Sequence, residues 1–230
     1  MTRAFIDLHC HTAASFDCLT RPADVVRAAA RRGLTHLVVT DHDRIDGALA
    51  ARDAAPSGLT VIVGEEVKTA DGDLLCAFLE RAIPPGLPAT EAIAAARDQG
   101  GLVGIPHPFD RYRGSLSKGA RLASLAPLVD WVEVHNARLV GHGNADAAAF
   151  AHEHGLPGVA VSDAHSALEV AVAYTALDGD PSTSAGLLAA LPSAELVPGR
   201  ATYFVRLWTP VAKGVQRLRG NGRIKPAVTG

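Results

Sequence analysis

Short apolar runs alternate with longer amphipathic stretches along most of the chain. The apolar runs are four to six residues long, which is typical of strands that are buried on both faces of a sheet. Six such runs are predicted as strands: residues 5–8, 36–40, 59–64, 102–105, 131–134 and 158–162. Five stretches with helical periodicity lie between them or after them: residues 23–32, 45–55, 91–99, 119–125 and 145–154.

Helix signals at the ends of these stretches support the assignment. Pro22 precedes the first predicted helix, and Gly33 and Gly155 follow the first and the fifth, as expected for helix starts and stops. Thr90 can cap the third helix. The sequence also predicts an extra strand or hairpin near residues 74–79, a strand at 202–207 and a short basic helix at 211–219.

The regular alternation of strands and helices predicts a parallel sheet. A chain of 230 residues suits a single α/β barrel, which usually takes about 200–250 residues. An open, doubly wound sheet is the alternative, but no glycine-rich phosphate loop follows the first strand. We therefore expect the sheet to close into a barrel.

Composition indicates a globular protein without disulfides. Apolar residues make up 48% of the chain, and no apolar run reaches the roughly 18 residues of a membrane span. The start of the chain lacks the pattern of a signal peptide. Three cysteines, at spacings that match neither a disulfide framework nor a zinc site, favour a reduced compartment. The expected location is the cytoplasm, with no membrane partner.

Charge is distributed unevenly along the chain. Residues 200–230 carry seven Lys or Arg and no acidic residue, although the net charge of the whole chain is −2. Residues 1–199 therefore carry 15 basic and 24 acidic side chains. We expect a barrel domain over 1–199 and a basic strand and helix extension over 200–230. Docking of the extension on the acidic body is favoured over a nucleic-acid-binding arm.

Histidine and carboxylate residues follow six of the predicted strands. They occur as Asp7, His9 and His11, as Asp41 to Asp43, as Glu65 and Glu66, as His107, as Glu133 and His135, and as Asp163 and His165. The carboxyl ends of parallel barrel strands all lie on one face, which is where such barrels carry their active sites. Six coincidences on one face are not explained by structural histidines. The sequence therefore predicts a functional cluster there.

The residue types in this cluster favour divalent transition metals. Imidazole nitrogens and carboxylate oxygens, without thiolates, are ligands for Zn, Mn or Fe. In His9-x-His11 both rings lie on one side of an extended chain, and Asp163-x-His165 repeats the spacing. Cys10, between the two histidines, is expected to point into the core.

Six short motifs resemble the PHP (polymerase and histidinol phosphatase) family of metal-dependent phosphoesterases. They occur in the family's order and cover residues 5–175: DLHCHT at 7–12, TDHD at 40–43, GEEV at 64–67, HPF at 107–109, VEVHNAR at 132–138 and SDAH at 162–165. The resemblance implies a distorted (β/α)7 TIM-like barrel with a site for two or three divalent metals (Mn, Zn or Fe) at the C-terminal face of its strands.

The resemblance also implies a set of metal ligands. The first metal takes His9, His11, Glu66 and Asp163, and the second takes His107 and shares Glu66 as a bridge. The third takes His42, His165 and Asp17, where many relatives have histidine. Glu65 is expected to be a surface carboxylate or one that supports the ligands.

Other residues near the cluster have less specific roles. Asp7 and Asp41 are expected to orient ligating imidazoles, with Asp41 counted among the catalytic groups. His135, also counted among the catalytic groups, is expected either to bind metal or to face the substrate. Three arginines that follow the metal motifs are candidates for phosphate binding: Arg111, Arg113 and Arg138.

The expected function is hydrolysis of phosphate mono- or diesters by a metal-bridging hydroxide. The substrate is expected to be a small anionic phosphoester, with nucleotides and short oligonucleotides left open. Cleavage of a C–N bond, as in amidohydrolases, is a second hypothesis, and a metal-stabilised binding module without turnover is a third. The substrate and the oligomeric state do not follow from the sequence.

Overall fold

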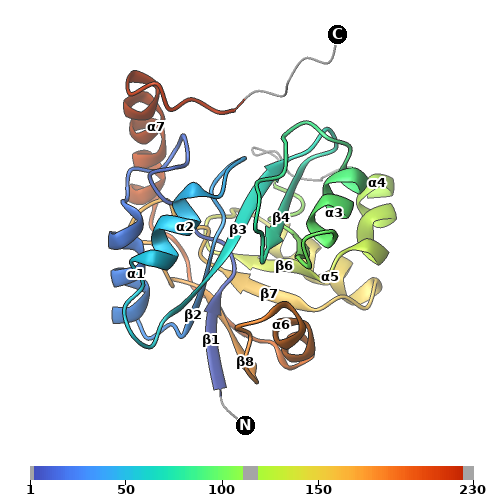
Figure 1. The fold of residues 1–230 in the computed structure, drawn as a ribbon. Helices are drawn as coiled ribbons and strands as arrows, with labels where there is room; N and C mark the ends of the chain where they lie inside the picture. Colours follow the sequence, from blue (N-terminus) through green and yellow to red (C-terminus); the bar gives the residue numbers. More distant parts are fainter. Residues whose placement is uncertain (1–2, 111–118, 225–230) are drawn as a thin grey trace.

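The computed structural model describes residues 3–110 and 119–224, and its centre is a nine-stranded sheet that curls into a nearly closed barrel (Figure 1). The strand order is β7-β6-β5-β4-β3-β2-β1-β8-β9. The strands are β1 (Arg3–Asp7), β2 (His36–Val39), β3 (Thr60–Lys68), β4 (Asp73–Ala77), β5 (Leu102–Ile105), β6 (Trp131–Asn136), β7 (Gly158–Val161), β8 (Tyr174–Asp178) and β9 (Glu195–Val197).

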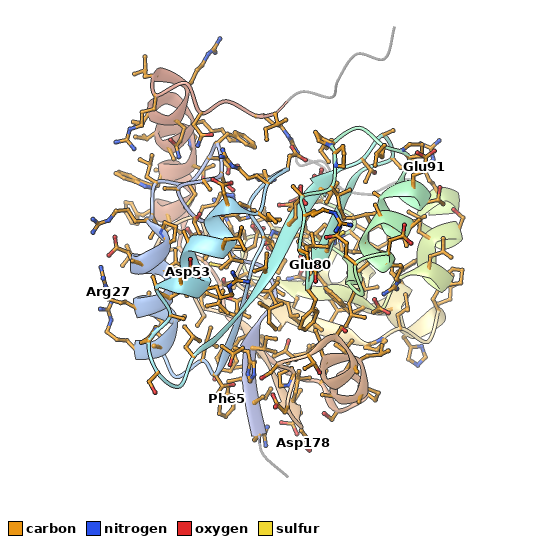
Figure 2. The ribbon with its side chains drawn as sticks, viewed as in Figure 1. Phe5, Arg27, Asp53, Glu80, Glu91 and Asp178 are labelled. Carbon is orange, nitrogen blue, oxygen red and sulfur yellow. The ribbon has the colours of Figure 1, made fainter. Side chains whose placement is uncertain are left out.

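Helices surround the barrel. They are α1 (Pro22–Arg31), α2 (Asp46–Asp53), α3 (Ala89–Arg97), α4 (Gly119–Leu125), α5 (Gly143–Glu153), α6 (Ser184–Ala190) and α7 (Tyr203–Leu218), with short 3₁₀ turns at Ala126–Leu128 and Leu191–Ser193. Charged side chains such as Arg27, Asp53 and Glu91 point away from the barrel into solvent (Figure 2). Among the helices of the described residues, none combines the length and the apolar character needed to cross a membrane.

The barrel predicted from the sequence is confirmed, with distortions. β1, β2 and β3 run parallel, and so do β5, β6 and β7. β4, the extra strand expected near 74–79, lies between these two groups and is antiparallel to β3 and to β5. All six parallel strands therefore point the same way. β8, β9 and α6 were not predicted from the sequence.

Closure of the barrel differs at its two ends. After β7 the backbone pairs with the chain that follows β1, where His11 donates to the Ala164 carbonyl at 2.9 Å and Asp163 donates to the His9 carbonyl at 3.0 Å. Toward the opposite end of the barrel, β8 pairs with the other side of β1. The Thr175 hydroxyl of β8 hydrogen-bonds to the backbone of Ala160 in β7. The tight closure therefore lies on the face where the parallel strands end.

Two apolar cores support the barrel. One fills the barrel interior, where Trp131 is fully buried and Ile6, Val38 and Leu75 contribute from other strands. Gly104 on β5 makes room for the Trp131 ring, since a Cβ there would lie 2.1 Å from the indole. Residues of α6 join this core and cover the end of the barrel where the chain begins (Figure 1). The other core packs the helices against the outer face of the sheet.

The end of the chain corrects a prediction. Residues 202–207 were predicted as a strand, but α7 is one helix from Tyr203 to Leu218 that continues through Pro210. Hydrogen bonds join α7 to the loop that follows β1. Gln216 donates from Nε2 to the carbonyls of Ala13, Ser15 and Cys18 at 2.7, 3.0 and 2.7 Å.

Candidate metal centre

The ends of five parallel strands bring eight titratable side chains into one buried cluster. β1 leads into two of them, β2 and β5 lead into one each, β3 carries one near its end, and β7 leads into two. The last comes from the loop after β1. They are His9, His11, Asp17, His42, Glu66, His107, Asp163 and His165, the eight ligands expected from the sequence.

Glu66 lies at the centre of this cluster. Its Oε2 is 3.2 Å from Nε2 of His9 and 3.3 Å from Nε2 of His11, and its Oε1 is 3.2 Å from Nε2 of His107. Asp163 completes the group, with Oδ1 3.7 Å and 3.6 Å from the same His9 and His11 nitrogens. One oxygen of Glu66 thus faces the His9 and His11 nitrogens, and the other faces the His107 nitrogen. A ligand that bridges two metals requires this arrangement.

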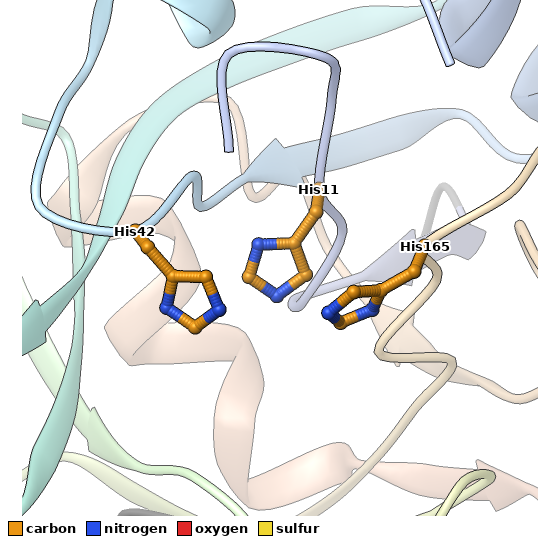
Figure 3. A group of neighbouring side chains, drawn as sticks. All are labelled: His11, His42 and His165. Carbon is orange, nitrogen blue, oxygen red and sulfur yellow. The ribbon is translucent and has the colours of Figure 1, made fainter. Parts of the chain in front are cut away.

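A second group of imidazoles meets at the edge of the cluster. The rings of His11, His42 and His165 come from three distant segments and converge (Figure 3). Asp17 lies between two of them, with Oδ2 3.4 Å from Nε2 of His42 and 3.4 Å from Nε2 of His165. The structure therefore brings together the three residues that were expected to hold a third metal.

A buried carboxylate fixes the orientation of the His9 ring. Nδ1 of His9 is 2.6 Å from Oε1 of Glu133. Because a carboxylate accepts hydrogen bonds, Nδ1 carries the proton and donates it. The lone pair of His9 is then on Nε2, which faces Glu66 and Asp163. Glu133 also accepts from the His107 backbone at 2.7 Å and from the Asn136 side chain at 2.9 Å.

Asp41 fixes the His11 ring through a serine. The Ser15 hydroxyl donates its only proton to Oδ1 of Asp41 at 2.8 Å, so it accepts from Nδ1 of His11 at 3.2 Å. The lone pair of His11 is therefore on Nε2 as well. Asp41 also accepts from the backbone and the hydroxyl of Thr12, both at 2.6 Å. Asp41 therefore reaches the His11 ring through Ser15 rather than by a direct hydrogen bond.

The donor set fits divalent cations. By these tautomers, Nε2 of His9 and Nε2 of His11 are both acceptors, yet they lie 3.0 Å apart and face two carboxylates. Oδ1 of Asp17 and Nδ1 of His42 are buried without a hydrogen-bond partner in the described part of the chain. Buried acceptors that face one another at these distances are unfavourable unless a cation lies between them. Imidazole and carboxylate ligands suit Zn, Mn and Fe.

The pKa values of His9 and Glu66 also indicate that the cluster attracts positive charge. Burial opposes charge on His9, but Glu133, Asp163 and Glu66 together raise its pKa well above the ordinary value. Burial likewise opposes ionisation of Glu66, yet His42 and His9 hold its pKa well below the usual range. The carboxylates therefore attract positive charge strongly, and metal binding displaces protons from such ligands.

Left-handed backbone conformations also occur at the cluster. Three residues of the cluster or beside it have left-handed φ values although they are not glycine: Asp43 (57°), His107 (28°) and Asp163 (52°). Such conformations cost free energy and persist where the surroundings enforce them, often at functional sites. At His107 and Asp163 the strained backbone directs a side chain into the cluster.

Two of the other predicted site residues, His135 and Arg138, lie away from the metal-binding groups. His135 donates from Nε2 to the Gly199 carbonyl at 2.8 Å and does not join the metal-binding groups of the described residues. A register shift between Glu133 and His135 places Asn136, rather than His135, beside Glu133. Arg138 is buried against Glu169 and Thr209 and does not line the pocket. Arg111 and Arg113 lie outside the described residues.

Two carboxylates have partners that differ from those expected. Glu65 is not on the surface, because it is fully buried and accepts from the Ile83 backbone at 2.8 Å; burial raises its pKa to about 8. Asp7 accepts from the backbone of Ser162 at 3.0 Å rather than from an imidazole, and burial raises its pKa to about 6.

A pocket of about 190 Å³ opens onto the cluster, and its walls include residues that the sequence analysis missed. Phe16, Asp73, Lys213 and Arg223 line it together with the metal-binding groups. Asp73 begins β4, and because β4 is antiparallel its first residue lies on the face where β3 ends. Lys68 pairs with this carboxylate at 3.1 Å.

The Asp17→Ala variant tests the third group of ligands. We expect it to lose about one equivalent of metal per chain and about tenfold or more in activity, because metal sites respond strongly to loss of a partner. Asp17→His, which supplies another ligand atom, is expected to retain the metal. Elemental analysis and phosphate release measure both effects. Unchanged metal content in Asp17→Ala, with a slightly lower melting temperature, would reduce Asp17 to a structural carboxylate.

Comparisons with known proteins agree with the geometry. The PHP domain family matches residues 7–126, about half of the chain, and a PHP-associated family matches residues 141–196. An uncharacterised protein of Methanocaldococcus jannaschii is 32% identical over 142 residues, which cover 57% of this chain and 81% of that protein.

Two solved structures share the fold. A two-domain protein of Bacteroides vulgatus that contains a predicted PHP-like metal-dependent phosphoesterase has a TM-score of 0.74 at 20% identity, over 86% of this chain. An endonuclease Q bound to a 27-mer duplex with an abasic lesion at its active site has a TM-score of 0.62 at 18% identity, over 83% of this chain. The chain spans 65% and 57% of these two proteins.

Proposed function

Because the chain belongs to the PHP family, we propose that it is a metal-dependent phosphoesterase that holds two or three Mn, Zn or Fe ions in the cluster around Glu66. The observation that carries the proposal is the convergence of five imidazoles and three carboxylates, with the His9 and His11 lone pairs turned inward by Glu133 and Ser15. His9, His11, Glu66 and Asp163 would hold one ion, and His107 would hold a second with Glu66 as the bridge. His42, His165 and Asp17 would hold the third.

The charge of the loaded centre favours an anionic substrate. Asp17, Glu66 and Asp163 contribute three negative charges, so two or three divalent ions leave about +1 or +3. Divalent metals supply Lewis acidity, which activates water near neutral pH and stabilises charge on phosphoryl oxygens. The phosphoester hydrolysis expected from the sequence is therefore favoured, whether the ester is a small molecule or a nucleotide.

The protein's own residues contribute orientation. Glu133 and the Asp41–Ser15 pair hold two imidazoles in one tautomer, so the ligand atoms need not reorganise when a metal binds. Thr12 and Ser15 both donate to Asp41, which holds the loop after β1 against the end of β2. Residues 200–230 would extend the barrel domain of residues 1–199, as the contacts of Gln216 suggest.

Phosphate release from 4-nitrophenyl phosphate tests the proposal. Protein stripped with a chelator is expected to be inactive and to regain activity when Mn, Zn or Fe is restored. A parallel assay with an aryl amide separates phosphoesterase from amidohydrolase activity. Metal uptake without hydrolysis of either substrate would instead support the hypothesis of a binding module, and hydrolysis of the amide alone would support the amidohydrolase.

A further inference from the structure

The basic end of the chain lies against the loop that carries Phe16 and Asp17. Gln216 of α7 is almost fully buried and donates to the carbonyls of Ala13, Ser15 and Cys18. After α7 the chain crosses toward the end of β3 (Figure 1), and Asn221 donates to the Ala14 carbonyl at 3.0 Å. These contacts fix the segment at the mouth of the metal pocket.

A groove of about 680 Å³ continues from the pocket along this segment. It shares Phe16, Lys213 and Arg223 with the metal pocket, so the two spaces adjoin. Four of the eight residues that line the groove are cationic, and none is acidic. The lining consists of Phe16, Lys68, Lys213, Arg217, Asn221, Gly222, Arg223 and Ile224.

Two of these cations are available to a ligand. Lys68 and Arg223 pair with Asp73, but Lys213 and Arg217 make no ion pair within the described residues, and both are exposed. The Lys213 ammonium lies 5.4 Å from the centre of the Phe16 ring, and the Arg223 guanidinium lies at the same distance. The groove therefore combines an aromatic ring with unneutralised positive charge.

We propose that this groove binds single-stranded nucleic acid and guides one of its phosphates into the metal pocket. Single-stranded nucleic acids are bound by grooves in which cations follow the backbone and aromatic side chains stack on bases. In this assignment Lys213 and Arg217 contact phosphates beyond the reacting one, and a base packs against Phe16. The proposal rests on the phosphoesterase function and narrows its substrate to an oligonucleotide.

Kinetics with two substrates measure the contribution of the groove. One substrate is a 5′-phosphorylated thymidine trinucleotide, which extends from the metal pocket into the groove, and the other is 4-nitrophenyl phosphate, which has no phosphate beyond the reacting one. Arg217 lines the groove but not the metal pocket, so Arg217→Ala is expected to lower the ratio of the two kcat/KM values about tenfold, the effect of one charge-assisted contact. Adding Lys213→Ala, at a residue that lines both spaces, is expected to lower the ratio further. Arg200→Ala with Arg219→Ala removes the same charge from exposed positions outside the groove and is expected to leave the ratio unchanged.

Binding measured without turnover gives a second readout. The probe is a six-residue thymidine strand with phosphorothioate linkages and a 3′ fluorophore, followed by fluorescence anisotropy. Since each phosphate contact to a single strand contributes about 0.7 to the slope of log Kd against log salt, the double variant in the groove is expected to lower that slope by about 1.4. The Arg200 and Arg219 variant is expected to leave it unchanged.

The outcomes separate this proposal from the phosphoesterase function. If 4-nitrophenyl phosphate is hydrolysed but the groove variant changes neither the ratio nor the slope, the groove assignment alone is wrong. Equal affinity for a hexaglutamate peptide would also overturn it, because such a peptide offers charge without bases. If neither ester is hydrolysed with any metal, the phosphoesterase function fails, and the anisotropy measurement still decides whether the groove binds a single strand.

Discussion

The Glu66→Gln variant is expected to lose metal from at least two positions and to hydrolyse phosphate esters about 1,000-fold more slowly than the wild type, or slower still. In the wild type, Oε2 of Glu66 lies near the His9 and His11 rings and Oε1 lies near the His107 ring, at 3.2 to 3.3 Å. An amide removes the negative charge and replaces one ligand oxygen with a donor. Elemental analysis and phosphate release measure the two losses.

Glu65→Gln is the matched control for this experiment. Glu65 is adjacent in sequence and equally buried, but it points away from the cluster and accepts from the Ile83 backbone. We expect this variant to keep its metals and its activity, since an amide oxygen still accepts from Ile83. Loss of activity in Glu65→Gln, together with retention in Glu66→Gln, would show that the wrong glutamate has been assigned as the bridge.

Glu133→Gln is expected to weaken metal binding about 10- to 100-fold although Glu133 is not proposed as a ligand. Glu133 accepts three hydrogen bonds, from the His9 ring, the His107 backbone and the Asn136 side chain. The amide NH₂ of a glutamine at this position would face one of these three donors and could not accept its hydrogen bond. We therefore also expect the free energy of unfolding to fall by about 1–3 kcal/mol. Metal titration and thermal unfolding measure the two effects.

Asp7→Asn separates a specific effect at His9 from general damage to a buried carboxylate. Asp7 is as buried as Glu133, and it accepts from backbone groups of Ser162, His9 and Ala171 rather than from a ring. It is expected to lower stability but to leave metal affinity close to that of the wild type. Equal loss of metal affinity in both variants would contradict the tautomer argument for His9.

The barrel and its functional face follow from the sequence because parallel strands place their carboxyl ends together. The predicted strand at 102–105 has the observed bounds, and the other five predicted strands overlap β1, β2, β3, β6 and β7. Once the strands are placed, His42 and His165 are expected on the same face of the barrel. The alternation of short apolar runs with amphipathic helices predicts the strand positions, because the pattern reflects which residues are buried.

The interior contacts of the site do not follow from periodicity. The register shift in β6 between Glu133 and His135 changes which side chains face the cluster, so His135 turns to Gly199 and Asn136 takes its place. A charged residue in the middle of an apolar strand was the available signal for Glu133. Asp73 was missed because its position depends on β4 running antiparallel.

The start of α7 shows the limit of local preference. Aromatic and branched residues over 202–207 favour a strand when the chain is considered alone. The structure has a helix there, which runs to Leu218, and its Gln216 side chain donates to the loop after β1. A local pattern does not report tertiary contacts, and tertiary context overrides a weak local preference.

Metal content of the purified protein tests the central claim most directly. The protein is prepared without chelator, and its Mn, Zn and Fe are counted by elemental mass spectrometry before and after dialysis against each ion. For a metal-dependent phosphoesterase we expect two to three equivalents per chain in the wild type, with fewer in Asp17→Ala and fewest in Glu66→Gln. A protein that is free of metal and takes up none of the three ions would contradict it.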